Sequence, residues 1–261
     1  MKKEMIKAAF FDVDDTLYDH VSNQIPLRHL QALENLQKQG IKICLSTGRS
    51  LALIENLGIL HTFAWDGIIA GNGSFVYDEN LDLLFESAIC PSSLQMIFQE
   101  AHNQNFPLFC SGNTVMIEEL SGFTKHLLDD FHIKTPEIRS LQDTDRFSTI
   151  TLCAPVEEIN LTPFRQIPDV KVIENKGWTD VIKKELSKFK GISVFMQHHG
   201  YDPHAYIAFG DGYNDKEMLE NAAIGVRVID GDPRLASITD QICPSAHEAG
   251  IYTYLQENGW F

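Results

Sequence analysis

Two regular patterns of apolar and polar residues alternate over the first 75 positions. Short apolar runs at 6–11, 41–45 and 67–70 predict buried strands, each of which ends at polar residues. Between the first two runs, apolar residues recur at helical spacing over 25–36, and Gly40 follows as a helix-ending residue. A strand–helix–strand order with connections of this length implies parallel strands and a doubly wound α/β sheet.

A less regular mixture of strand and helix patterns begins after Gly73 and continues to about residue 182. The expected strands there are 83–89, 107–109, 115–117, 149–153, 170–174 and 179–182, and the expected helices are 92–102, 123–131 and 156–164. Strand patterns return at 207–209, 224–228 and 241–243, and a last helix is expected near 247–257. We therefore expect a core domain of residues 1–77 and 183–261, with an inserted α+β domain of residues 78–182.

The composition is that of a globular protein. Apolar residues make up 44% of the 261 positions, which is enough to fill a core. The formal net charge is −15, which argues against non-specific binding to nucleic acid or to an anionic membrane, because both require a positive surface. A small anionic substrate is still compatible with this charge, since one cationic pocket can lie in an acidic protein.

Targeting signals and disulfide patterns are not evident. No apolar run reaches the roughly 18 residues that a membrane helix needs, and the run at 8–11 is too short for the core of a secretory signal. The five cysteines are scattered and form no C-x-x-C pair, so neither a disulfide framework nor a zinc site is expected. These features favour a cytoplasmic protein.

Carboxylates concentrate at the ends of the expected strands. Asp12 and Asp14 follow the first strand, residues 46–49 (Ser-Thr-Gly-Arg) follow the second, and residues 210–215 (Gly-Asp-Gly-Tyr-Asn-Asp) follow the strand near 207. Parallel α/β sheets bind ligands beyond the carboxyl ends of their strands. A cluster of like charges at such a site is costly unless a cation compensates it, and Mg²⁺ is the simplest hard cation for oxygen ligands.

This residue set is suited to phosphoryl transfer. One carboxylate can attack phosphorus to form an aspartyl-phosphate while a second handles a proton. The hydroxyl and amide at Thr47 and Gly48, a lysine, and the amide of Asn214 suit phosphate oxygens. Each motif alone could instead be a turn, a helix cap or part of a calcium loop. Their occurrence in one order, each after an expected strand, is the stronger signal.

That combination resembles the haloacid dehalogenase superfamily, in particular the Cof-type phosphatases with a class IIB cap, over residues 6–255. The resemblance implies that Asp12 is the nucleophile and a Mg²⁺ ligand. It also implies that Asp14 is the general acid and base, with its main-chain carbonyl on the metal. Thr47 and Gly48 would bind the phosphate, and Asn72 precedes the cap as in the family. The inserted α+β domain would be that cap.

The same resemblance assigns the later motifs. Asp211 would bind Mg²⁺, Asn214 would contact the phosphate, and Asp215 would support the metal shell. Lys188 best matches the family's phosphate-binding lysine. The three other lysines of the same stretch, Lys183, Lys184 and Lys190, stay open as alternatives.

Three parts of the chain depart from the family pattern. Asp15 replaces a common glycine, and we expect its side chain to reach solvent or to cap a helix. Glu185 and Phe189 replace glycines around the lysine, and residues 226–232 replace a stretch of smaller side chains.

The expected function is therefore Mg²⁺-dependent hydrolysis of a small phosphomonoester through an aspartyl-phosphate. A sugar phosphate, a nucleotide or a cofactor phosphate would be the substrate, and the cap would select among them. Two alternatives are a phosphomutase resembling phosphomannomutase, and a non-catalytic phosphosugar-binding protein. A carboxylate two residues after the nucleophile is what separates phosphatases and mutases from the dehalogenases of the superfamily.

Overall fold

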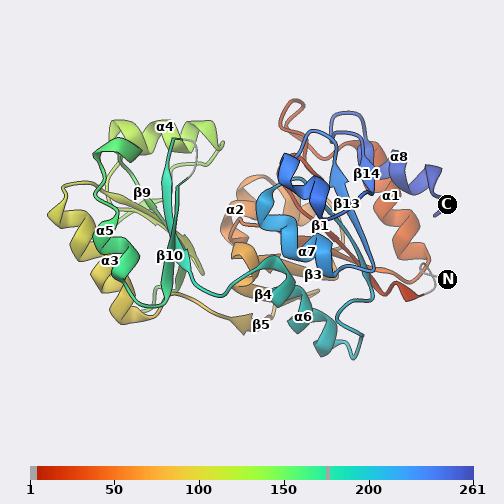
Figure 1. Ribbon diagram of the computed structural model, residues 1–261, viewed down its shortest axis with the longest axis horizontal. Helices are drawn as coiled ribbons and strands as arrows, with labels where there is room; N and C mark the ends of the chain where they lie inside the picture. The colour runs from red at the N-terminus through yellow and green to blue at the C-terminus, as the bar shows by residue number, and fades with distance from the viewer. Residues whose placement is uncertain (1–4, 175–176) are drawn as a thin grey trace. The chain divides into compact units, whose positions relative to one another are not determined.

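The chain forms two compact units in the computed structural model, which describes residues 5–174 and 177–261 (Figure 1). The first unit comprises the described residues of Met1–Gly48, together with Ile59–Phe85 and Ser187–Phe261. The second comprises Arg49–Gly58 and Glu86–Leu186. The junctions expected at 77/78 and 182/183 thus lie at 85/86 and 186/187 in the structure.

The first unit is built on a mainly parallel sheet. Its strand order is β14-β13-β12-β1-β2-β3-β4-β5, in which all pairs from β14 to β3 are parallel and β3 and β4 are antiparallel. The chain moves outward from β1 in both directions, which confirms the expected α/β sheet and creates a switch point between β1 and β12. The strands are β1 (Ala8–Phe11), β2 (Lys42–Ser46), β3 (Gly67–Ala70), β4 (Phe75–Asp78), β5 (Leu83–Glu86), β12 (Tyr206–Gly210), β13 (Ile224–Val228) and β14 (Ile242–Cys243).

Helices cover the two faces of this sheet. Side chains alternate along β1, so that Phe10 packs with α6 and α7, while Phe11 stacks on Phe209, which in turn contacts Tyr254 of α8. Helices α1 and α8 contact each other, as do α6 and α7 (Figure 1). The helices are α1 (Leu27–Lys38), α6 (Lys188–His198), α7 (Lys216–Asn221) and α8 (Gly250–Glu257), with short 3-10 turns η2 (Ile59–His61), η3 (Gly71–Gly73), η5 (Tyr213–Asp215) and η6 (Pro233–Ser237).

The second unit is an α+β structure with its own core. Its sheet has the order β10-β11-β9-β6-β7-β8 and is antiparallel except at β7 and β8. Helices α3 and α5 contact each other, and their buried Ile97 and Phe164 belong to one hydrophobic cluster, whereas Leu127 of α4 and Leu53 of α2 belong to another. The elements are α2 (Leu51–Asn56), α3 (Pro91–Asn103), β6 (Leu108–Gly112), β7 (Val115–Ile117), α4 (Gly122–Asp130), β8 (Glu137–Ile138), β9 (Phe147–Leu152), η4 (Val156–Glu158), α5 (Thr162–Gln166), β10 (Val170–Glu174) and β11 (Thr179–Lys183).

One expected helix is wrong. The apolar spacing over 156–164 predicts a continuous helix, but the structure has a 3-10 turn at Val156–Glu158 and a separate short helix that begins at Thr162. Pro163 lies in the first turn of that helix. A proline has no N–H to donate and is tolerated only there, so the helix starts at this point instead of running through it.

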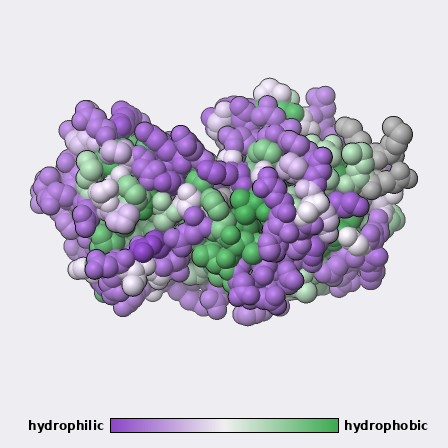
Figure 2. Space-filling model, turned by 90° about the horizontal axis from the view of Figure 1, so that it is seen from below, coloured by the Kyte–Doolittle hydropathy of each residue, from purple (hydrophilic) through white to green (hydrophobic). Residues whose placement is uncertain are grey.

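The surface shown in Figure 2 is mostly hydrophilic, with a confined hydrophobic area. Among the described helices, none combines the length and the apolar character that crossing a membrane requires.

Candidate active site

The carboxyl ends of β1, β2 and β12 bring the three main motifs to one edge of the sheet. Phe11 at the end of β1 is in register with Leu45 of β2 and with Phe209 of β12. The next residue, Asp12, donates its main-chain N–H to the carbonyl of Phe209 at 2.9 Å. The strand registers therefore place the motif that begins at Asp12 between the other two.

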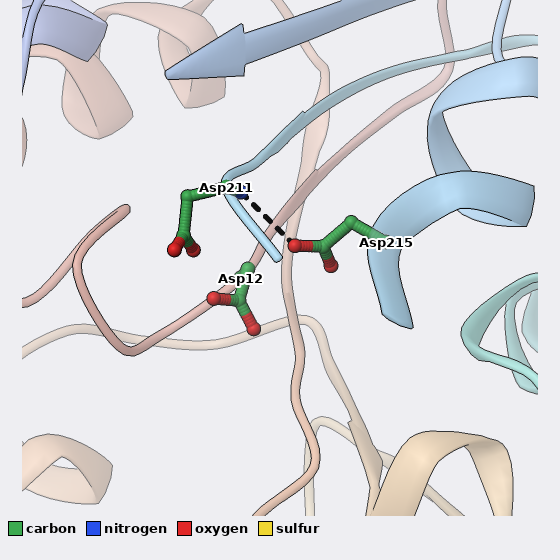
Figure 3. A group of neighbouring side chains, drawn as sticks. All are labelled: Asp12, Asp211 and Asp215. Atoms are coloured by element: carbon green, nitrogen blue, oxygen red, sulfur yellow. Dashed lines mark hydrogen bonds between the residues drawn. The ribbon is translucent and has the colours of Figure 1, made fainter. Parts of the chain in front are cut away.

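Three carboxylates converge at this edge (Figure 3). Each of Asp12, Asp211 and Asp215 offers an oxygen that lies within 4.8 Å of the others. Asp215 is fully buried and Asp12 is 6% exposed. The Thr16 hydroxyl donates to Asp211 Oδ1 at 2.9 Å and so orients that side chain. Such a cluster requires positive charge nearby.

Lys188 supplies part of that charge. Its fully buried ammonium donates to Asp12 Oδ1, and to Asp215 Oδ1 at 2.6 Å. Lys188 is the first residue of α6, whose N-cap is Ser187. Of the four candidate lysines it is the one among these carboxylates, whereas Lys183 pairs with Asp169 in the second unit.

The protonation equilibria reflect this crowding. Burial raises the pKa of Asp12 well above its ordinary value, and the charges of Asp215 and Asp211 add to the rise, while Lys188 opposes it. Burial and the charge of Asp215 raise the pKa of Asp211 to about 6. Burial lowers the pKa of Lys188, but the charges of Asp12 and Asp215 outweigh it and keep the pKa above its ordinary value.

The donor set fits a hard divalent cation. One ammonium balances one of the three carboxylates, which leaves two negative charges, and oxygen ligands are those that Mg²⁺ prefers. The oxygens of Asp215 already accept hydrogen bonds. Its Oδ2 accepts from the N–H groups of Asp211 and Gly212 at 3.0 and 2.9 Å, and its Oδ1 accepts from Lys188. Asp12 and Asp211 are therefore better placed than Asp215 to ligate a metal directly.

Gly210 makes this arrangement possible. A Cβ atom there would lie 2.5 Å from Cγ of Asp215, so any side chain would displace that carboxylate. Glycine is thus required at the end of β12 because the side chain of Asp215 lies so close to its main chain.

A second group of residues meets around Asn72. Its Oδ1 accepts from Asn214 Nδ2 at 3.1 Å, and its side chain lies against Gly48, where an added Cβ would be 3.3 Å away. Its N–H donates to the carbonyl of Thr47 at 2.9 Å. The structure therefore joins three of the four residues expected to bind phosphate, Thr47, Gly48 and Asn214, through Asn72. The sequence pattern assigned no site role to Asn72; its occurrence between two glycines was the available signal.

Asp14 lies on the loop that follows Asp12. Its carboxylate is 37% exposed, and its Oδ1 is 2.8 Å from Nε2 of His20. Sequence reasoning did not single out His20, because nothing in the spacing shows that the loop folds back on itself.

Comparison with known proteins agrees with this geometry. A family model for haloacid dehalogenase-like hydrolases matches residues 9–255. The chain is 30% identical to YkrA of Bacillus subtilis (strain 168), provisionally named a phosphatase, over 97% of this chain and 98% of that protein.

Two solved structures share the fold. BT1666 from Bacteroides thetaiotaomicron, described among the phosphatases of the HAD superfamily, has a TM-score of 0.85 and 22% identity, covering 98% of this chain and 96% of its own. The subclass IIB sugar phosphatase BT4131 has a TM-score of 0.81 and 24% identity, covering 98% of this chain and all (100%) of its own. The chain therefore belongs to the haloacid dehalogenase superfamily, as a phosphatase of its Cof-type branch.

Proposed function

We propose that this phosphatase hydrolyses a small phosphomonoester in a Mg²⁺-dependent reaction that passes through an aspartyl-phosphate on Asp12. The observation that carries the proposal is the placement of Asp12 beside a buried ammonium and within a group of three carboxylates. Lys188 orients an oxygen of Asp12, and its charge opposes the rise in the pKa of Asp12 and so favours the ionised form that a nucleophile requires.

The reaction would proceed in two steps. Asp12 attacks phosphorus, the bond from phosphorus to the leaving oxygen breaks, and Asp14 gives a proton to that oxygen. Asp14 then takes a proton from a water molecule, which attacks phosphorus and releases phosphate from Asp12. A carboxylate that serves first as acid and then as base returns the enzyme to its starting state.

The remaining site residues would bind the phosphate and the metal. We assign the phosphate oxygens to Lys188, the Thr47 hydroxyl, the Gly48 amide and Asn214. Asp12, Asp211 and the main-chain carbonyl of Asp14 would hold Mg²⁺, and Asp215 would support them through its bonds to Lys188 and to the 211–212 main chain. When bound, Mg²⁺ supplies positive charge that neutralises the phosphate and lowers repulsion toward the nucleophile.

We further propose that the second unit acts as the cap. Such a domain excludes bulk water and contacts the leaving group, so the choice of phosphomonoester would depend on its residues. The five cysteines are free thiols, which supports a reducing cytoplasm as the place of action.

The test is phosphate release from a panel of sugar, nucleotide and cofactor phosphates, with Mg²⁺ and with a chelator. We expect Mg²⁺-dependent release that falls by orders of magnitude in Asp12→Asn. Asp78→Asn, a matched change at the end of β4, is the control and should keep its activity. No release by the folded protein with Mg²⁺, or an active Asp12→Asn variant, would contradict the proposal. Isomerised sugar phosphate without free phosphate would instead indicate a mutase.

A further inference from the structure

We infer that His20 is a positioning residue for this reaction, which holds the carboxylate of Asp14 where it can exchange protons with the leaving oxygen and the attacking water. The inference rests on the proposed function, because it needs Asp14 to act as general acid and base. Its basis is the 2.8 Å contact between Nε2 of His20 and Oδ1 of Asp14.

The loop after the nucleophile is folded so that these two residues must meet. The N–H groups of Leu17 and Tyr18 both donate to the carbonyl of Val13, at 3.1 and 2.8 Å, which closes a tight turn. As a result the main chains of Asp14 and Tyr18 pair as an isolated bridge. His20 follows two residues later, and its ring packs edge-on against the buried ring of Tyr18 with centroids 5.1 Å apart.

Asp19 braces the chain next to His20. Its carboxylate is almost completely buried and accepts from the N–H groups of Val21 and Ser22, at 2.9 and 3.2 Å. It also accepts from the Ser22 hydroxyl at 2.6 Å and contacts Nδ1 of His247 at 3.0 Å. With Asp19 fixed from four directions and Tyr18 buried, the backbone of His20 has little freedom. The imidazole is therefore a fixed support and not a mobile surface side chain.

Asp14 needs such a support. Its side chain is 37% exposed, and an exposed carboxylate ordinarily samples several rotamers. Proton transfer in the transition state depends on hydrogen-bond geometry, so each misplaced rotamer lowers the rate. A hydrogen bond from a fixed ring reduces the number of rotamers that the carboxylate can adopt.

The experiment exploits the difference between leaving groups. An alkoxide requires protonation as it leaves, whereas p-nitrophenolate does not, and kcat/KM reports only the steps up to the first irreversible one. The measured quantity is the ratio of kcat/KM for a primary alkyl phosphate to kcat/KM for p-nitrophenyl phosphate, with Mg²⁺. A general loss of structure lowers both values and leaves the ratio unchanged.

Three variants separate the explanations. His20→Phe keeps a ring beside Tyr18 but removes the hydrogen bond, and we expect the ratio to fall by at least about tenfold. His20→Gln presents an amide nitrogen near the position of Nε2 and should restore the ratio to within a few-fold of the wild type. His247→Gln is the matched control, because His247 supports the same loop through Asp19 but does not touch Asp14. It should leave the ratio unchanged.

An unchanged ratio in His20→Phe, with an active wild type, would overturn the role of His20 and leave the proposed function intact. An equal fall of the ratio in His247→Gln would also overturn it, since the effect would then come from the loop as a whole. A wild type that releases no phosphate from either ester would contradict both. Should His20→Phe fail to fold, His20→Asn, whose shorter amide does not reach Asp14, takes its place with the same expected loss.

Discussion

Asp15 occupies a backbone position that favours glycine. Its φ is 56°, in the left-handed region, and its side chain is exposed to solvent as expected. Aspartate and asparagine enter this region more readily than other residues with a side chain, so aspartate is the substitution for glycine that the loop tolerates.

We therefore expect Asp15→Gly to keep or slightly raise the free energy of unfolding. Asp15→Val should lower it by about 1–2 kcal/mol, because a β-branched residue resists a left-handed conformation. Urea unfolding of the three proteins measures this difference. Equal stability of Asp15→Val and the wild type would show that the loop does not impose this conformation.

With Asp211 as a metal ligand, as proposed, metal binding is linked to stability. Its pKa is raised from 3.8 to about 6, so without a cation the folded protein holds a proton there more tightly than the unfolded chain does. The contribution of Asp211 to stability is therefore favourable at low pH and is lost as the pH rises from about 4 through 6. Asp211→Asn removes this dependence.

In chelator at pH 7 we expect Asp211→Asn to be more stable than the wild type by up to about 3 kcal/mol, with the difference vanishing towards pH 4. Saturating Mg²⁺ should remove or reverse the difference, because the wild type alone keeps the full ligand set. Chemical unfolding at several pH values, with and without Mg²⁺, checks both statements. A wild type that is the more stable protein in chelator at pH 7 would contradict them.

At the residue scale, the sequence predicted the residues that follow strands and missed those that depend on loop geometry. Asp12 and Asp211 converge because parallel strands end at one edge, which follows from topology alone. Lys188 needed the resemblance to a family. Asn72 lies in a 3-10 turn and His20 on a folded-back loop, and the spacing of apolar residues encodes neither of these.

The start of α6 depends on the turn η3. Gly73 has φ of +92°, and an added Cβ would lie 2.2 Å from the carbonyl oxygen of Ser187, the N-cap residue that precedes Lys188. The turn η3 and the start of α6 are therefore in contact next to Lys188.

We expect Gly73→Ala to push Ser187 away, to destabilise the protein by several kcal/mol, and to lower kcat by misplacing Lys188. Gly40→Ala is the matched control, because Gly40 has φ of +80° but no atom within 4 Å of an added Cβ. It should cost only about 1–2 kcal/mol for the left-handed conformation and leave kcat unchanged. Equal effects of the two substitutions would mean that contact with α6 is unimportant.

Among the secondary-structure elements, the spacing of apolar residues and the length of apolar runs predicted the buried strands well. Strands β1 and β3 are apolar throughout and β2 has an apolar centre, so each stands out from the polar residues at its ends. The helix predicted over 156–164 was wrong because the apolar spacing there suits a helix, whereas Pro163 restricts where a helix can begin. The strand expected at 83–89 ends at Glu86, since alternation alone does not mark the end of an edge strand.

The hydrophobic clusters that include α3 and α4 of the second unit share no residue with the cluster that includes α6 and α7 of the first, so each unit should respond to its own mutations. In the second unit, Asp145 is 3% exposed and accepts two hydrogen bonds of 2.7 Å from Arg139, which is itself 12% exposed. Removing Asp145 leaves the little-exposed Arg139 with its ion pair to the exposed Glu137, and loss of one partner of such a pair is destabilising.

We expect Asp145→Asn to speed amide hydrogen exchange within 86–186 by on the order of a hundredfold, without changing exchange in β1 or β12. Glu174→Gln breaks an exposed ion pair with Arg165 in the same unit and should have little effect. Exchange followed by mass spectrometry resolves both regions. Equal acceleration of the two units in Asp145→Asn would show that they unfold together.

The boundaries between the two units could not be predicted from the sequence alone. Strands β4 and β5 continue past residue 77 as part of the first unit, and residues 49–58, which follow the second motif, group with the other unit. Long-range packing decides which unit a hairpin or a short helix joins, and local sequence patterns carry no information about that packing.

Hydrolysis by the proposed route requires that Asp12 becomes phosphorylated. The direct measurement uses Asp14→Asn, which lacks the base for the second step, mixed with p-nitrophenyl phosphate and Mg²⁺ and quenched in acid. Intact mass and peptide mapping should show one added phosphoryl group, located on Asp12. The double variant with Asp12→Asn should show none. Phosphate release without any modified protein, or a phosphoryl group on another residue, would contradict the account.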